Sequence, residues 1–332
     1  MDFVTLEEDA FTYGGVDEIA PGVRRVIAKN PSKFTYRGTG TYIVGRGDVA
    51  VIDPGPLLDG HREALTAALE GETVRSILVT HCHADHSPLA AWLAAETGAP
   101  TIAFGPHGSA DGERDIGTLP DDFGRAPEPE PADGDEGADA EPDEPKLEES
   151  TDTDFVPDRA VVTGETVFES GAVKMTALHT PGHTSNHTCF TLADGQQRIL
   201  FSGDHVMGWS TTVVSPPDGD MTAYIDSLRL VAGLRDDLVV PTHGAPVRDP
   251  RTFVEALVDH RLERERQVLG AVRRGLVTIP DMVTELYAAV RIELHRPAAS
   301  SVLGHLVKLV DDGEVTVVDG EAPRLDSTYA AT

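Results

Sequence analysis

The stretch His81-Cys82-His83-Ala84-Asp85-His86 places three imidazoles and one carboxylate within six residues. It follows the apolar run 76–80, which predicts a buried strand, and it precedes Ser87-Pro88, an N-cap and first-turn proline for a helix that ends before Gly98. The stretch is therefore a loop at the carboxyl end of a strand. Imidazole and carboxylate suit zinc and similar divalent ions, whereas a structural zinc site favours thiolates and a closed ligand set. We predict a catalytic metal site.

Three more short motifs follow predicted strands or their turns. They are Pro181-Gly182-His183-Thr184, Ser202-Gly203-Asp204-His205 and Pro241-Thr242-His243-Gly244. A single histidine after a turn is more often a surface or capping residue. Taken together with the first cluster, these motifs predict nitrogen and oxygen ligands that a sheet brings together at the ends of its strands.

The rest of the chain predicts sheets with helices outside them. Short apolar runs bounded by Gly, Asp and Pro predict a hairpin over 42–52 and later strands over 173–178, 187–192, 198–202 and 238–240. Predicted helices alternate with these strands, which is typical of a layered α/β sandwich. Beyond Pro250 the pattern changes to three helices and a short strand, which indicates a small winged-helix-like domain.

In this order, the motifs resemble the metallo-β-lactamase superfamily over residues from about 40 to 250. The resemblance implies an αββα sandwich with a dinuclear metal site between its sheets. It also implies a division of ligands: the first ion on His81, His83 and His183, the second on Asp85, His86 and His243, and Asp204 as the bridge. Zn²⁺ is the expected ion, although Mn²⁺ and Fe²⁺ also accept these donors.

Two ions roughly 3.5–4 Å apart can share a hydroxide whose pKa has fallen to about 7. We therefore predict a dinuclear metal-dependent hydrolase that uses a metal-bridging hydroxide on a small ester, thioester, lactone or similar substrate. Asp85 is the predicted catalytic residue, because it would orient that hydroxide. His187, His205 and Trp209 are predicted to support the metal ligands or to contact the substrate.

Within the superfamily, residues 30–45 and 207–212 resemble the subgroup that includes β-lactamase-like protein 2, which also carries a winged-helix-like domain. The expected organisation is a hydrolase domain over 1–249, a winged-helix-like domain over 250–322 and a tail over 323–332. True β-lactamases fit less well, because their commonest class has arginine in place of His86 and cysteine in place of Asp204.

Two alternatives stay open. Some relatives in this subgroup cut single-stranded RNA, and a two-ion centre suits attack at phosphorus. The other alternative is a nucleic-acid-binding regulator whose hydrolase-like domain senses a ligand. Charge disfavours RNA and DNA, because 27 Lys and Arg face 56 Asp and Glu, a formal net charge of -29. The expected partner is a small-molecule substrate, and the C-terminal domain is expected to line the cleft or form a homodimer surface.

The acidity is concentrated in one segment. Residues 107–158 hold 19 acidic side chains against three basic ones, and within them 107–153 has Pro-Glu and Asp-Gly repeats that bury too little surface to offset ordering entropy. We therefore predict that 107–153 is a disordered acidic insertion. Two cysteines, no signal-peptide pattern and no long apolar run predict a cytoplasmic chain that does not enter a membrane.

Overall fold

The structure is a computed structural model that describes residues 2–108, 115–125, 150–318, 320 and 322–332. The chain divides into two compact units. The first comprises Met1–Glu113, Leu147–Thr212 and Asp218–Arg261, and the second comprises Arg114–Lys146, Val213–Pro217 and Leu262–Thr332. The division falls inside a continuous helix at Arg261, whereas the sequence-based boundary at residue 250 marks the start of that helix.

The first unit contains two sheets. The strands of the seven-stranded sheet, in spatial order, are β1 (Val16–Ala20), β2 (Val23–Ile27), β3 (Gly40–Arg46), β4 (Asp48–Ile52), β5 (Thr73–Leu78), β6 (Thr101–Ala103) and β7 (Arg159–Ala160). The strands of the five-stranded sheet, in spatial order, are β12 (Leu238–Pro241), β11 (Arg198–Gly203), β10 (Thr188–Ala193), β9 (Val173–His179) and β8 (Thr166–Ser170). The predicted hairpin is confirmed as β3 and β4, which pair antiparallel. The β4–β5 and β11–β12 pairs are parallel.

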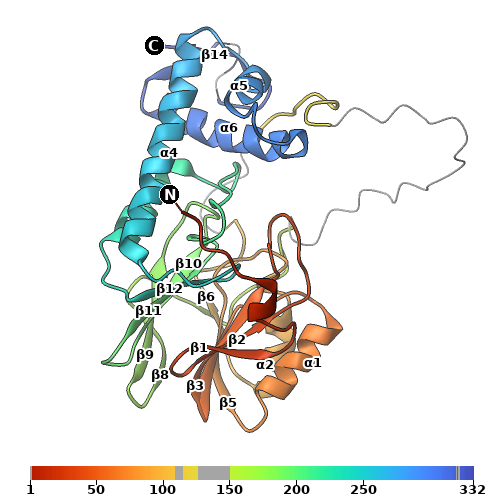
Figure 1. Ribbon diagram of the computed structural model, residues 1–332, viewed down its shortest axis with the longest axis vertical. Helices are drawn as coiled ribbons and strands as arrows, with labels where there is room; N and C mark the ends of the chain where they lie inside the picture. Colours follow the sequence, from red (N-terminus) through yellow and green to blue (C-terminus); the bar gives the residue numbers. More distant parts are fainter. Residues whose placement is uncertain (1, 109–114, 126–149, 319, 321) are drawn as a thin grey trace, which may run out of the picture. The chain divides into compact units, whose positions relative to one another are not determined.

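Helices α1 (Asp59–Ala68) and α2 (Leu89–Thr97) lie beside the first sheet (Figure 1), and a further short helix, η1, spans Glu8–Ala10. Alternation along β3 and β4 explains this layering, because successive side chains point to opposite faces of a strand. Tyr42 and Ile52 join a core that includes Phe190 of the second sheet. Ile43 and Val51 face the other way, into a core with the helices.

Local sequence signals explain where the helices begin and end. The helix α2 ends before Gly98, as predicted, and Gly98 adopts the left-handed conformation at φ 72°. The helix α3 (Met221–Ala232) begins after Asp220, whose side chain accepts a hydrogen bond from the backbone of Ala223 at 2.8 Å. These capping signals explain where α2 ends and where α3 begins.

The second unit is built on helices. They are the C-terminal part of α4 (Pro250–Arg273), α5 (Ile279–Leu286), the short η3 (Ile292–Leu294) and α6 (His295–Asp311). A ribbon of β13 (Val315–Val317) and β14 (Tyr329–Ala331) completes it. Among the described residues, no helix has both the length and the apolar character that crossing a membrane requires.

Two expectations for this unit need correction. The prediction of a tail over 323–332 is wrong, because β14 pairs with β13 and Tyr329 is fully buried. The apolar run at the chain end is too short to predict a strand without its partner. Residues 115–125 of the predicted disordered insertion are also ordered, since Ile116 and Phe123 pack against the core of the second unit. Residues 107–108 and 150–153 are also described, and the backbones of Ser150 and Asp152 bond to Ala84 and Cys82; residues 109–114 and 126–149 of the predicted insertion lie outside the described residues.

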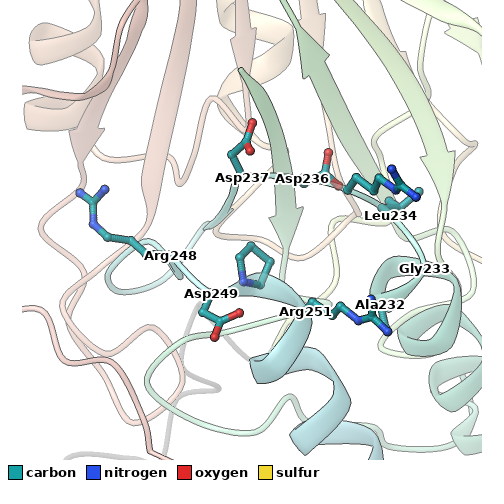
Figure 2. A pocket seen from close by; sticks show the side chains of 10 residues that line it. Ala232, Gly233, Leu234, Asp236, Asp237, Arg248, Asp249 and Arg251 are labelled. Atoms are coloured by element: carbon teal, nitrogen blue, oxygen red, sulfur yellow. The ribbon is translucent and has the colours of Figure 1, made fainter. Parts of the chain in front are cut away.

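A polar cavity of about 530 Å³ lies in the first unit where α3 ends, β12 begins and α4 begins. Figure 2 shows Asp236, Asp237, Arg248 and Arg251 around it. The buried Asp236 carboxylate lies 3.5 Å from Arg198, and burial raises the pKa of this carboxyl group. None of the predicted metal ligands lines this cavity, so it is separate from the candidate site.

Candidate metal centre

The predicted ligands all lie on loops that leave the carboxyl ends of strands. The stretch 81–86 follows β5, His183 follows β9, Asp204 follows β11 and His243 follows β12. Because the two sheets pack face to face, these loops meet at one edge of the sandwich. The fold thus gathers side chains that are far apart in the chain, as the sequence motifs predict.

The seven predicted ligands form three overlapping groups, and within each group the ligand atoms lie within 4.8 Å of one another. The groups are His81, His83 and His183; His81, His86 and Asp204; and Asp85, His86 and His243. In the first group, His83 Nδ1 lies 2.9 Å from His81 Nε2 and 3.2 Å from His183 Nε2. In the last, Asp85 Oδ2 lies 3.4 Å from His86 Nε2 and 3.3 Å from His243 Nε2.

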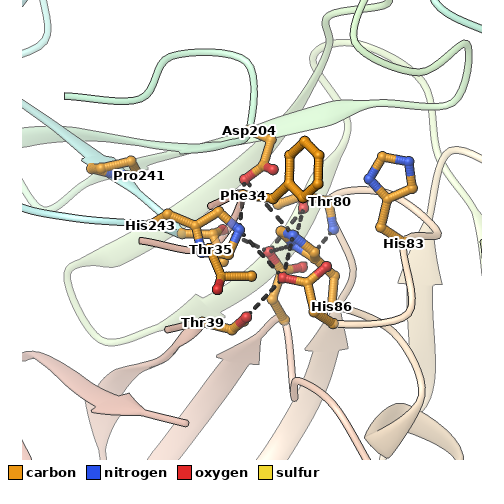
Figure 3. Close-up of polar contacts among 12 residues, drawn as sticks. Phe34, Thr35, Thr39, Thr80, His83, His86, Asp204, Pro241 and His243 are labelled. Atoms are coloured by element: carbon orange, nitrogen blue, oxygen red, sulfur yellow. Dashed lines mark hydrogen bonds and ion pairs between the residues drawn. The ribbon is translucent and has the colours of Figure 1, made fainter. Parts of the chain in front are cut away.

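Asp204 lies between the two outer groups. Its Oδ2 is 3.8 Å from His183 Nε2, whereas its Oδ1 is 3.4 Å from His243 Nε2 and 3.7 Å from His86 Nε2. Figure 3 shows His243 pointing toward the Asp204 carboxylate, with His86 nearby. The two oxygens of one carboxylate therefore face different sets of imidazoles.

Burial and charge act in opposite directions on these side chains. Burial lowers the pKa of His83 to about 3. Burial also lowers the pKa of His86, but the facing carboxylates outweigh it and raise that pKa to about 9. Burial lowers the pKa of His243 as well, but Asp204 and Asp85 outweigh burial and raise that pKa above its usual value. Burial alone would raise the pKa of Asp85, yet the imidazoles beside it lower that pKa to about 2. The carboxylates thus require positive charge beside them, from protons or from metal ions.

Asp53 is a buried hydrogen-bond acceptor behind the ligands. Its Oδ1 accepts from Thr80 N at 2.8 Å, and its Oδ2 accepts from Thr80 Oγ1 at 2.8 Å, Thr242 Oγ1 at 2.9 Å and His86 Nδ1 at 2.9 Å. Donation by His86 Nδ1 fixes the tautomer that leaves Nε2 free to bind a metal. Asp53 has a φ of 48°, a left-handed conformation that aspartate tolerates better than most residues.

The three additional predicted residues differ in their surroundings. His187 Nε2 accepts from the backbone N–H of Asp204 at 3.2 Å, so His187 supports a ligand loop. The His205 ring is fully buried and packs edge-on against Tyr224 at 5.1 Å, outside the three ligand groups. Trp209 stacks on Tyr36 with ring centres 4.7 Å apart.

Among the residues that contact the candidate ligands, Asp53 and Thr39 were not predicted from the sequence. Asp53 follows an apolar strand, a position typical of a site residue, but nothing local links it to His86. Thr39 donates from Oγ1 to Asp85 Oδ2 at 2.7 Å and is fully buried. A threonine next to two glycines carries no distinctive signal, so only the packed structure identifies it.

The fold and the ligand groups together define a two-sheet α/β sandwich with a candidate metal centre at the ends of its strands. The chain belongs to the Metallo-beta-lactamase superfamily, whose family model matches residues 36–243. A second model, the Beta-lactamase associated winged helix domain, matches residues 278–322. Both parts of the predicted fold class are therefore confirmed.

Curated relatives match along most of the chain. Lactamase-like protein adaB of Aspergillus niger is 27% identical over 318 residues, covering 90% of this chain and 84% of that protein. Atrochrysone carboxyl ACP thioesterase of Aspergillus chevalieri is 29% identical over 316 residues, with the same coverage of 90% and 84%. The family and these relatives agree with the prediction of a hydrolase.

Solved structures confirm the fold. A beta-lactamase domain protein from Burkholderia ambifaria superposes with a TM-score of 0.73 at 21% identity, covering 99% of this chain and 97% of that one. A metallo-beta-lactamase family protein from Thermus thermophilus has a TM-score of 0.68 at 22% identity, covering 95% of this chain and 100% of that one.

Proposed function

We propose that the protein is a hydrolase that depends on two divalent metal ions, with Zn²⁺ as the first candidate, and that it cleaves thioesters of small acyl groups. One observation carries the proposal: the two oxygens of Asp204 face different imidazole groups. A carboxylate in that position suits a bridge between two ions.

The residues fit such a pair of ions. Among the described residues, His86 Nε2 and Asp204 Oδ1 are buried atoms without a hydrogen-bond partner, which is costly unless a cation occupies the space between them. Imidazole and carboxylate donors suit Zn²⁺, Mn²⁺ and Fe²⁺. The assignment is one ion on His81, His83 and His183, a second on Asp85, His86 and His243, and Asp204 shared by both.

When bound, the ions would supply a water molecule of lowered pKa and a Lewis acid for the acyl oxygen. Asp85 would accept a hydrogen bond from the attacking water and hold it toward the acyl carbon. A thiolate leaves readily from a thioester because alkyl thiols are much more acidic than alcohols, as the pKa of about 8.5 of a free cysteine thiol illustrates. Hydrolysis therefore needs no separate acid to protonate the leaving group.

The choice of thioester over other esters rests on the relatives. A thioesterase from Aspergillus chevalieri covers 90% of this chain at 29% identity. Oxygen esters and lactones present the same acyl carbon and stay as neighbouring substrate classes.

The alternative of RNA cleavage or nucleic-acid binding is less favoured by charge. In the second unit, Arg273, Arg274 and Lys308 each form an ion pair with a carboxylate. Paired cations offer little net charge to phosphates. These ion pairs favour a small-molecule substrate.

A substrate panel with metal analysis tests the proposal. Purified protein is expected to hold two ions per chain, to release thiol from acyl-pantetheine thioesters, and to lose this activity on chelation. Asp85→Asn should abolish turnover while the fold survives, whereas Asp59→Asn, a matched change at an exposed carboxylate, should have no effect. Cleavage of single-stranded RNA without thioester turnover would refute the proposal, as would thioester turnover that persists after the ions are removed.

A further inference from the structure

Three consecutive residues that lead into β3 contact the ligand group of Asp85, His86 and His243 or the residue next to it in the chain. The Gly38 carbonyl accepts from His243 Nδ1 at 3.2 Å, and Thr39 Oγ1 donates to Asp85 Oδ2 at 2.7 Å. Gly40 N donates to the carbonyl of Thr242, the residue before His243, at 2.9 Å. We infer that Gly38-Thr39-Gly40 is a positioning element that orients Asp85 and His243 toward one of the two metal ions.

The direction of each hydrogen bond follows from its partners. A carbonyl oxygen can only accept, so His243 Nδ1 carries the proton toward Gly38 and Nε2 keeps the lone pair that a metal needs. Nε2 is also the atom that lies 3.3 Å from Asp85 Oδ2. The backbone of Gly38 therefore selects the tautomer of His243 that can bind metal.

Asn30 orients the Thr39 hydroxyl in the same way. Its Oδ1 accepts from Thr39 N at 3.0 Å, and its Nδ2 donates to Thr39 Oγ1 at 3.0 Å. Because Oγ1 already accepts this bond, its own hydrogen is directed to Asp85. A chain of donors thus runs from the amide through the fully buried Thr39 to the ligand carboxylate and holds Oδ2 between His86 and His243.

The two glycines allow the close approach that this arrangement needs. Gly38 has a φ of +114°, and a Cβ there would lie 2.2 Å from the Ala28 carbonyl oxygen. A Cβ on Gly40 would lie 3.1 Å from the Thr242 carbonyl oxygen. A larger residue at position 38 would therefore displace the carbonyl that binds His243.

The inference rests on the proposed two-ion centre and makes a specific prediction for it. Thr39→Val keeps the shape of the side chain but removes the hydroxyl. Loss of a supporting hydrogen bond of this kind typically weakens metal affinity about 10–100-fold. Because the contacts of this segment fall on Asp85 and His243, only one of the two ions should be weakened. Thr39→Ser, which keeps the hydroxyl, should restore its affinity.

The experiment is a Zn²⁺ titration of metal-stripped full-length protein against a chromophoric chelator, together with the melting temperature of the metal-stripped form. Thr176→Val is the matched control, since its hydroxyl pairs with Thr191 on β9 and β10 and contacts no ligand. The inference predicts two ions bound to wild type, Thr39→Ser and Thr176→Val, and one ion weakened in Thr39→Val.

Three outcomes distinguish a failure of the positioning role of Thr39 from a failure of the two-ion centre. If wild type binds two ions and Thr39→Val binds both with wild-type affinity, the positioning role is refuted while the two-ion centre stands. If Thr39→Val weakens both ions equally and lowers the melting temperature, Thr39 is only structural and the inference also fails. If wild type itself binds fewer than two ions, the proposed function fails and the inference with it.

Discussion

Replacement of Asp53 by asparagine tests whether the metal ligands depend on the acceptor behind them. Asp53 is fully buried, and its two oxygens accept from Thr80 N, Thr80 Oγ1, Thr242 Oγ1 and His86 Nδ1. An amide nitrogen at the Oδ2 position would face the donor on His86, and the flipped amide would face the backbone N–H of Thr80. Hydroxyls can reverse their roles, and the His86 ring can do so only by moving its proton from Nδ1 to Nε2, whereas the backbone N–H of Thr80 cannot.

In one orientation of the amide the buried N–H of Thr80 is left without an acceptor, which costs about 1–3 kcal/mol, and in the other the His86 ring must move its proton to Nε2. The ring of His86 also loses its fixed tautomer, so affinity for the ion that we propose it binds should fall about 10–100-fold. Urea unfolding measures the first effect on metal-stripped protein, and a Zn²⁺ titration measures the second. Asp59→Asn, at a mostly exposed carboxylate, should change stability by less than about 0.5 kcal/mol. Wild-type stability together with wild-type metal affinity in Asp53→Asn would refute the reasoning.

Three further predictions concern other parts of the chain. Burial lowers the pKa of His61 to about 4, below its usual 6.5, so the unfolded chain takes up a proton before the folded one does. Up to about 3 kcal/mol of the free energy of unfolding is therefore lost as pH falls from 6.5 to 4. In urea unfolding, His61→Gln should show a smaller loss of stability over this pH range than wild type, and an equal loss would contradict this. Phe123→Ala should destabilise the second unit by about 2 kcal/mol, roughly half the cost for a fully buried ring, because Phe123 is partly buried. Phe3→Ala, at an exposed ring, should leave stability unchanged. Equal unfolding curves for Phe123→Ala and wild type would exclude a packing role for Phe123. Trp209→Phe keeps the stacked ring but removes a buried indole N–H that has no partner among the described residues. If this indole N–H contacts the substrate, KM should rise about threefold to tenfold while kcat is retained. An unchanged KM would exclude the contact.

The sequence predicts more of the site than of its surroundings. All seven predicted ligands fall in the three groups of the structure, because few residue types bind such ions and each ligand lies in a short motif after a strand. The predicted end of a helix at Gly98 is likewise a local signal and is confirmed, and Asp220 caps α3 through a local signal of the same kind. By contrast, the strands β1 and β2 and the C-terminal strand β14 were not predicted, since each is short and depends on a partner for its stability.

Local sequence patterns predict the residue types of the candidate ligands, their order along the chain and the alternation of strands and helices that carries them. The position of Asp204 between two imidazole groups, and the contacts of Asp53 and Thr39 with His86 and Asp85, become visible only in the folded chain. These contacts join residues that are far apart along the chain. Asp53 binds Thr80 across 27 positions and Thr242 across 189, and hydrogen bonds over such separations leave no periodic pattern in the sequence, because they exist only after the two sheets have packed together.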